Sequence, residues 1–140
     1  MKALLDATAI VALLLNPPQR LDGLSELFTL DLAFYEVGNA IWKAAKVHRS
    51  FNEEKGAKAV RTLEKLMENM NVLPFREVEA SKVFEVGVRS GLTFYDSSYL
   101  VTALGKGLTL ITDDKKLARV AEEEGIEVFG SDMLPTLLGP

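Results

Sequence analysis

The chain has 140 residues, of which 48% are hydrophobic and 26% charged, a mix that fits one soluble globular domain spanning residues 1–140. A net charge of −4 argues against an extended nucleic-acid surface, which usually belongs to a basic domain. The absence of cysteine excludes disulfides and thiolate sites, and a single histidine excludes multi-histidine metal sites. The sequence has no apolar run of membrane-spanning length and no convincing signal peptide, so we expect a cytoplasmic protein with no membrane contact.

Short apolar runs alternate along the chain with segments that carry helix signals. In chain order we expect a strand at 2–5, helices at 8–15, 33–48 and 50–70, an extended segment at 71–75, helices at 77–90 and 95–104, a strand at 108–112, a helix at 115–124 and a strand at 126–129. Thr8 is expected to cap the first helix, and Ser50 to open a capping box before the third. This alternation predicts an α/β fold, with a parallel sheet covered on both faces.

Acidic residues stand at positions where they can meet. Asp6 directly follows the first strand, and Asp113 and Asp114 directly follow the strand at 108–112. Ligands of open parallel sheets bind outside the carboxyl ends of the strands, and Glu36 and Asp96, near the starts of two helices, can join that edge. Four carboxylates need a counter-charge, and no fixed basic partner is close in sequence. We therefore expect Mg²⁺ or Mn²⁺ as a cofactor.

Most of these acids also have a purely structural interpretation. Asp96 has capping-box spacing from Thr93, and one of Asp113 and Asp114 can simply begin a helix, where negative charge is favourable. Glu36 can equally be an exposed surface residue. Asp6 is harder to explain in this way, because a charge that ends an apolar strand beside a core usually has a partner.

Four segments together resemble a known family. They are LLDAT at 4–8, YEVGNAI at 35–41, GLTFYDSSYL at 91–100 and LITDDKKLA at 110–118. In this order, and in a chain of this length, they resemble the PIN-domain nucleases, and among them the small VapC-type toxins of toxin–antitoxin pairs. The likeness covers essentially the whole chain and implies a three-layer α/β/α fold with a central parallel sheet.

The resemblance also implies a site and an activity. The acidic quartet of the family falls on Asp6, Glu36, Asp96 and Asp114, the last chosen over Asp113 by the family's final motif. Supporting positions are Thr8, Thr112 and Asn39, with Asp113 as an extra carboxylate of unassigned role. The implied activity is metal-dependent endoribonuclease cleavage of RNA. The implied partners are a VapB-type antitoxin and a second copy of the chain in a homodimer.

A basic segment offers a place for RNA in this acidic chain. Residues 43–65 contain seven basic and three acidic residues, a local charge of +4. Lys43 follows Glu36 by two helical turns and is a candidate phosphate contact. For the basic residues beyond Arg49, solvated helix faces paired by their spacing are the favoured explanation. Two alternatives stay open: an inactive PIN scaffold that binds protein or RNA, and a receiver-like phosphoacceptor domain. The latter would need its acidic pair after the first strand.

Overall fold

The computed structural model describes residues 1–139. Over this part of the chain the strands are β1 (Ala3–Leu5), β2 (Leu27–Leu30), β3 (Asn71–Leu73), β4 (Thr109–Ile111) and β5 (Val128–Phe129). The α-helices are α1 (Ala7–Leu15), α2 (Leu32–Lys46), α3 (Glu53–Glu68), α4 (Ala80–Ser90), α5 (Phe94–Lys106), α6 (Lys115–Glu123) and α7 (Leu134–Leu138). Short 3₁₀ turns lie at Asp22–Glu26, Phe75–Glu77 and Ser131–Met133. Within residues 1–139 none of these helices combines the length and the apolar character that crossing a membrane requires.

The five strands form one parallel sheet in the order β3-β2-β1-β4-β5. The first strand of the chain is therefore the central one, and its Ala3 pairs with Leu27 of β2 on one side and with Thr109 of β4 on the other. The chain adds strands first towards β3 and later towards β5. The order reverses between β1 and β4, which is where ligands of such sheets bind.

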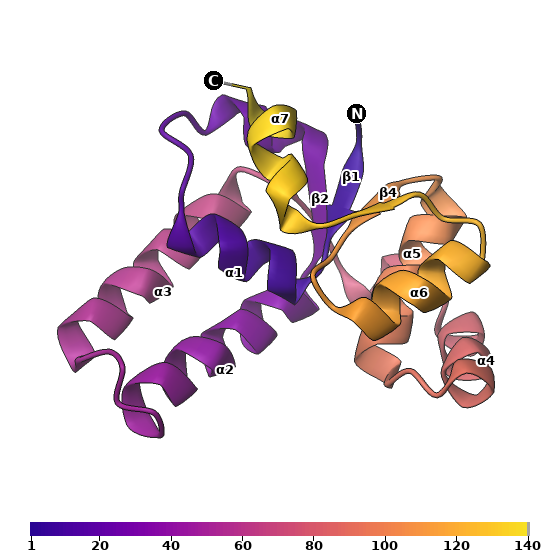
Figure 1. The fold of residues 1–140 in the computed structure, drawn as a ribbon, viewed down its shortest axis with the longest axis horizontal. Coiled ribbons are helices and arrows are strands. Elements are labelled where there is room, and N and C mark those ends of the chain that lie inside the picture. The colour runs from indigo at the N-terminus through magenta and orange to yellow at the C-terminus, as the bar shows by residue number, and fades with distance from the viewer. Residues whose placement is uncertain (140) are drawn as a thin grey trace.

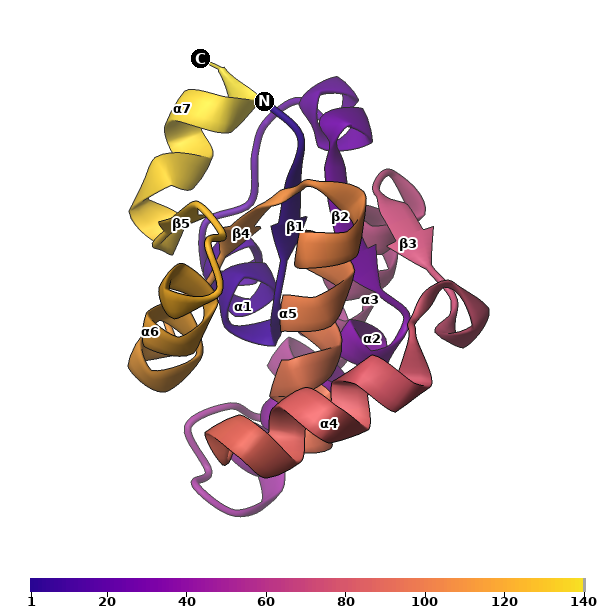
Figure 2. The same ribbon diagram turned by 90° about the vertical axis from the view of Figure 1, so that its right-hand side faces the viewer.

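The sheet separates two layers of helices. Leu5 of β1 packs with buried residues of α1, α2, α3 and α7, whereas Leu4 packs with those of α4, α5 and α6. Successive side chains of a strand point to opposite faces, so consecutive leucines of β1 serve both cores. Figures 1 and 2 show α1–α3 on one side of the sheet and α4–α6 on the other. The predicted three-layer α/β/α architecture is confirmed.

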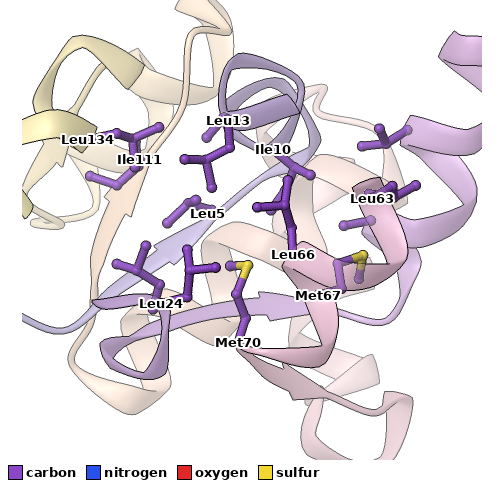
Figure 3. Packing of buried hydrophobic residues seen from close by; sticks show 14 of the residues in the cluster. Leu5, Ile10, Leu13, Leu24, Leu63, Leu66, Met67, Met70, Ile111 and Leu134 are labelled. Carbon is purple, nitrogen blue, oxygen red and sulfur yellow. The ribbon is translucent and has the colours of Figure 1, made fainter. Parts of the chain in front are cut away.

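The core beneath α1 and α3 fixes the central strand. Leu5, Ile10, Leu63 and Leu66 are all buried there, and Figure 3 shows them converging from β1, α1 and α3. Burying a side chain of this size contributes about 1.5–3 kcal/mol relative to leaving it exposed. The end of β1, where Asp6 stands, is therefore set by close packing.

Two helix caps differ from the sequence expectation. The N-cap of α1 is Asp6 and not Thr8, because the carboxylate of Asp6 accepts a hydrogen bond from the backbone N–H of Ala9. The N-cap of α3 is Asn52, whose side chain accepts from the backbone N–H of Lys55. The hydroxyl of Ser50 instead donates to a carbonyl at the end of α2. In both helices the cap is the residue directly before the first turn, because its side chain is the nearest acceptor for the free backbone N–H groups of that turn.

The sequence analysis also missed elements. The strand β2 and the helix α7 were not predicted, and α4 begins at Ala80 instead of residue 77, because a 3₁₀ turn ends at Glu77. The residues of β2, Leu27–Leu30, are a run of four between Glu26 and Asp31. So short a run carries no periodicity of its own, and β2 is defined by its pairing with β1 and β3.

Candidate active site

The four predicted acids lie along the carboxyl edge of the sheet. Asp6 is the residue after β1, and Asp114 follows β4 and begins α6. Glu36 lies in the second turn of α2, which follows β2, and Asp96 lies in the first turn of α5. The first two come from the ends of adjacent strands, at the reversal of strand order. The structure thus brings together acids from distant parts of the sequence.

Two threonine hydroxyls hold the carboxylate of Asp6, which is only 3% exposed. Thr8 Oγ1 donates to Oδ1 at 2.6 Å, and Thr112 Oγ1 donates to Oδ2 at 2.5 Å. Both hydroxyls also accept backbone N–H groups, from Asp113 at 2.9 Å and Asp114 at 3.0 Å. The start of α1 and the end of β4 are therefore joined through one carboxylate.

The carboxylates influence one another. Burial raises the pKa of Asp6, and the charge of Asp114 raises it further, against hydrogen bonds that lower it. Burial also raises the pKa of Glu36, to which Asp96 and Asp6 add. For Asp96 the causes of a raised pKa are burial and then Asp114 and Asp6. Like charges repel one another over a few ångströms, so the four acids form one electrostatic unit with an excess of negative charge.

Asp96 is free of the capping role that its spacing suggested. The N-cap of α5 is Thr93, whose hydroxyl accepts from the backbone N–H of Asp96 at 3.1 Å. Within the part of the chain that the structure describes, the carboxylate of Asp96 makes no hydrogen bond in return. It is half-buried at the helix start, with its oxygens available to a ligand.

The two consecutive aspartates after β4 have different surroundings. Asp114 Oδ1 accepts from the backbone N–H of Leu117 and caps α6, and Asp114 raises the pKa of Asp6 and Asp96. Asp113 is exposed and turned to the C-terminal segment, where its Oδ1 accepts from the backbone N–H of Ser131 at 2.8 Å. Asp113 therefore supports the segment after β5, and Asp114 belongs to the acidic unit.

Glu36 has a partner that the sequence analysis missed. Tyr99 of α5 donates its hydroxyl to Glu36 Oε1 at 2.8 Å. Burial and the neighbouring Glu36 raise the pKa of Tyr99, so the phenol stays a protonated donor. Asn39, expected to support Glu36 from one turn away, is exposed and has no side-chain hydrogen bond to any acid within residues 1–139. The signal for Tyr99 was its position one helical turn after Asp96.

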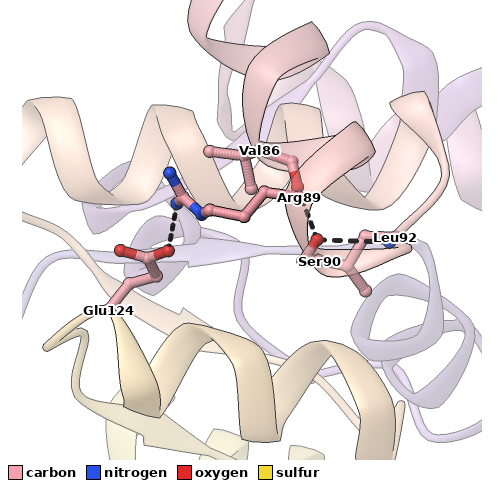
Figure 4. Close-up of polar contacts among 5 residues, drawn as sticks. All are labelled: Val86, Arg89, Ser90, Leu92 and Glu124. Atoms are coloured by element: carbon pink, nitrogen blue, oxygen red, sulfur yellow. Dashed lines mark hydrogen bonds and ion pairs between the residues drawn. The ribbon is translucent and has the colours of Figure 1, made fainter.

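The turn that leads into α5 is anchored by neighbouring helices. Ser90 Oγ donates to the carbonyl of Val86 at 2.6 Å and accepts from the backbone N–H of Leu92 at 3.2 Å (Figure 4). Arg89 of α4 pairs with Glu124 at the end of α6 (Figure 4). An exposed pair of this kind contributes little to stability. The half-buried contacts of Ser90 therefore fix the turn, and with it the start of α5.

One lysine stands beside the acids. Lys116 Nζ donates to the carbonyl of Gly91 at 3.0 Å, and its charge lowers the pKa of Asp96 against the stronger causes that raise it. Gly91 has φ +80°, a conformation that side chains other than glycine rarely adopt. Lys43, the cation predicted from spacing, is exposed on α2. It follows Glu36 by seven residues, about 10 Å along the helix. Lys116 is therefore the basic side chain whose charge acts on Asp96.

The donor set fits a hard divalent cation. Its oxygens are carboxylates with an excess of negative charge, which is what Mg²⁺ and Mn²⁺ prefer. Within residues 1–139, no group of three or more histidine, cysteine, aspartate or glutamate side chains is arranged so that it could hold a metal ion. Magnesium commonly keeps several waters and takes only one or two carboxylates directly, so the other acids would act through water.

The parallel three-layer fold and the acids at the reversal of strand order together point to one family of proteins. The PIN domain family matches residues 3–123, a range that includes all four acids. The chain belongs to the PIN-domain family. Membership of this family excludes the alternative of a receiver-like phosphoacceptor domain. The predicted resemblance to VapC-type PIN proteins is confirmed.

Two relatives from Pyrobaculum aerophilum are similar over most of their length. Exonuclease VapC9 is 38% identical over 114 residues, which cover 81% of either protein. Ribonuclease VapC3 is 34% identical over 125 residues, which cover 84% of this chain and 93% of that protein. Both names contain a nuclease activity, and one of them specifies RNA.

Solved structures show the same fold. PAE2754 from Pyrobaculum aerophilum has a TM-score of 0.82 and 33% identity, covering 99% of this chain and 95% of its own. FitAcB from Neisseria gonorrhoeae has a TM-score of 0.61 and 17% identity, covering 92% of this chain and 97% of its own. The second likeness concerns the fold alone.

Proposed function

We propose that this chain is a Mg²⁺- or Mn²⁺-dependent endoribonuclease and the toxin of a toxin–antitoxin pair. The observation that carries the proposal is the acidic unit of Asp6, Glu36, Asp96 and Asp114 at the carboxyl edge of the sheet, in a chain whose relatives are named as nucleases. Three of these acids have raised pKa values, which a cation among them would lower again. A metal ion would therefore offset the repulsion among the carboxylates of this unit.

Each acidic residue would have its own role in phosphodiester hydrolysis. Asp6, Asp96 and Asp114 would hold the cation directly or through water, and Glu36 would complete this set or orient the attacking water. When bound, the cation supplies Lewis-acid polarisation of the phosphate and a bound water of lowered pKa. Thr8 and Thr112 keep both oxygens of Asp6 in place, so Asp6 needs little rearrangement on binding.

RNA and protein partners are parts of the same proposal. Lys116, beside the acids, and Lys43, further along α2, would attract the phosphates of RNA. A VapB-type antitoxin would find exposed apolar surface in the groove between α2 and α3, where Trp42 and Val60 line the walls. Homodimerisation would cover exposed apolar side chains such as Phe84 on α4 and Phe94 on α5.

A cleavage assay tests the proposal. The purified chain is incubated with linear and circular RNA in Mg²⁺ or Mn²⁺, and then in EDTA. An endonuclease cuts the circular RNA, whereas an exonuclease degrades only the linear one. We expect Asp6→Asn and Asp96→Asn to lose more than the roughly 10–100-fold that outer-shell partners of a metal typically cost.

The matched control is Asp22→Asn. Asp22 is exposed and, within residues 1–139, its carboxylate pairs with Arg20 alone. It begins the 3₁₀ turn that precedes β2, at the opposite end of the strands from the acidic unit. It should cleave like the wild type. Equal activity of the wild type and both site variants would refute the assigned site. A folded chain that binds no Mn²⁺ in a calorimetric titration would instead support an inactive scaffold.

A further inference from the structure

Glu36 is held differently from the three aspartates of the site. Asp6 and Asp114 are N-caps, fixed by backbone N–H groups of their own helices, and Asp96 lies in a first helical turn. Glu36 lies within α2 on a longer side chain. Across residues 1–139, its carboxylate takes its side-chain hydrogen bond from Tyr99 of α5, at 2.8 Å. The position of this carboxylate therefore depends on the opposite helix layer.

Tyr99 is itself deeply buried. It is 1% exposed and packs in the core under α4, α5 and α6, among buried residues that include Leu100 and Leu117. It also follows Asp96 by three residues, which places both side chains on one face of α5. The same short stretch of helix thus carries one acid of the site and the hydroxyl that holds another.

We propose that Tyr99 is a positioning residue of the site, whose hydroxyl binds Glu36 Oε1 and leaves Oε2 free for the metal ion or its water. The inference rests on the proposed nuclease function. A glutamate side chain has more rotational freedom to lose on ordering than an aspartate. Pre-ordering by Tyr99 therefore matters more for Glu36 than a comparable bond would for the aspartates.

A purely structural role for Tyr99 predicts a different effect of removing its hydroxyl. A buried tyrosine needs a hydrogen-bond partner for its hydroxyl, and Glu36 supplies one. In that case removing the hydroxyl lowers stability and leaves metal binding unchanged. If Tyr99 positions Glu36, removing the hydroxyl weakens metal binding, and only while the Glu36 carboxylate is present.

The test is a double-mutant cycle of Tyr99→Phe and Glu36→Ala. Three quantities are measured for each variant. The Mn²⁺ dissociation constant is measured by calorimetry without RNA, the cleavage rate is measured at saturating Mn²⁺, and the unfolding midpoint is measured in EDTA. We expect Tyr99→Phe to weaken Mn²⁺ binding or slow cleavage by about 10-fold, the lower end of the effect of outer-shell partners. In the Glu36→Ala background the same change should have less than about a 2-fold effect, because coupled residues are not additive.

Tyr95→Phe is the matched control, since it removes the same hydroxyl from the same helix at a side chain that is 57% exposed. It should match the wild type. Glu36→Asp is a second route if Tyr99→Phe unfolds, because it keeps a carboxylate but shortens it away from the Tyr99 hydroxyl. We expect a similar loss, and wild-type Mn²⁺ affinity and rate in Glu36→Asp would overturn the inference.

The outcomes separate this inference from the proposed function. An active wild type with unchanged Tyr99→Phe, or equal losses in both backgrounds, would overturn the positioning role alone. A wild-type chain that neither binds Mn²⁺ nor cleaves RNA would overturn both.

Discussion

Replacing Thr112 with valine tests how the buried carboxylate of Asp6 is held. The Thr112 hydroxyl donates to Asp6 Oδ2 at 2.5 Å and accepts from the backbone N–H of Asp114 at 3.0 Å, and Thr112 is 3% exposed. A hydrogen bond to a charged group contributes about 1.5–3 kcal/mol, and an N–H left without a partner costs about 1 kcal/mol or more. Because valine has nearly the same shape and opens no cavity, we expect Thr112→Val to lower the free energy of unfolding by about 2–4 kcal/mol at neutral pH.

Part of this loss should depend on pH. The hydroxyl favours the ionised form of Asp6, so its removal raises a pKa that already lies above the ordinary value of 3.8. The charge-dependent part of the loss is complete above the folded-state pKa of Asp6. It shrinks as the pH falls through that pKa, because a protonated carboxyl no longer needs the donor.

Urea unfolding in EDTA across this pH range measures both effects. The matched control is Thr62→Val, which removes a hydroxyl that donates to a neutral acceptor, the backbone carbonyl of Lys58 within α3. It should cost less, and by the same amount at every pH. If Thr112→Val cost no more than Thr62→Val, or if its cost did not change with pH, the hydroxyl would not be supporting an ionised Asp6.

Two further predictions concern the other aspartates. Asp96→Asn should stabilise the metal-free chain at neutral pH by less than about 1 kcal/mol after solvent screening. Folding raises the pKa of Asp96, so this carboxyl contributes to stability below its ordinary pKa of 3.8, and the contribution is lost as the pH rises through the folded-state pKa. The difference in free energy of unfolding between variant and wild type should therefore grow with pH in urea titrations. Asp113→Ala should lose about 1 kcal/mol of stability with its Ser131 hydrogen bond and keep RNA cleavage, whereas Asp114→Ala should lose cleavage; the reverse result in paired assays would show that the two roles are exchanged.

The sequence predicted the parts of the fold that carry local signals. Helix α4 ends at Gly91 as expected, because only a residue that tolerates positive φ closes the helix there. The strand β4 stands out as an apolar run between a glycine and two acids. The strand β2 has no such signal, because Leu27–Leu30 become a strand through pairing on both sides. Its place in the sheet is a tertiary property.

The candidate site divides in the same way. Asp6 and Asp114 could be placed from sequence, because each directly follows a strand, and strand ends of a parallel sheet share an edge. The contact of Tyr99 with Glu36 joins residues 63 positions apart, and the contact of Lys116 with Gly91 joins residues 25 apart. Contacts of this kind depend on how α5 and α6 pack against the sheet, which no local pattern encodes.

The division of the acids between the layers links activity to complete folding. Asp6 and Glu36 belong to α1 and α2, on one side of the sheet, and Asp96 and Asp114 to α5 and α6, on the other. Until β4 pairs with β1, Asp6 lacks the hydroxyl of Thr112, and until α5 packs against the sheet, Glu36 lacks the hydroxyl of Tyr99. A site divided in this way is complete only when the last third of the chain, which carries Asp96 and Asp114, has folded onto the first.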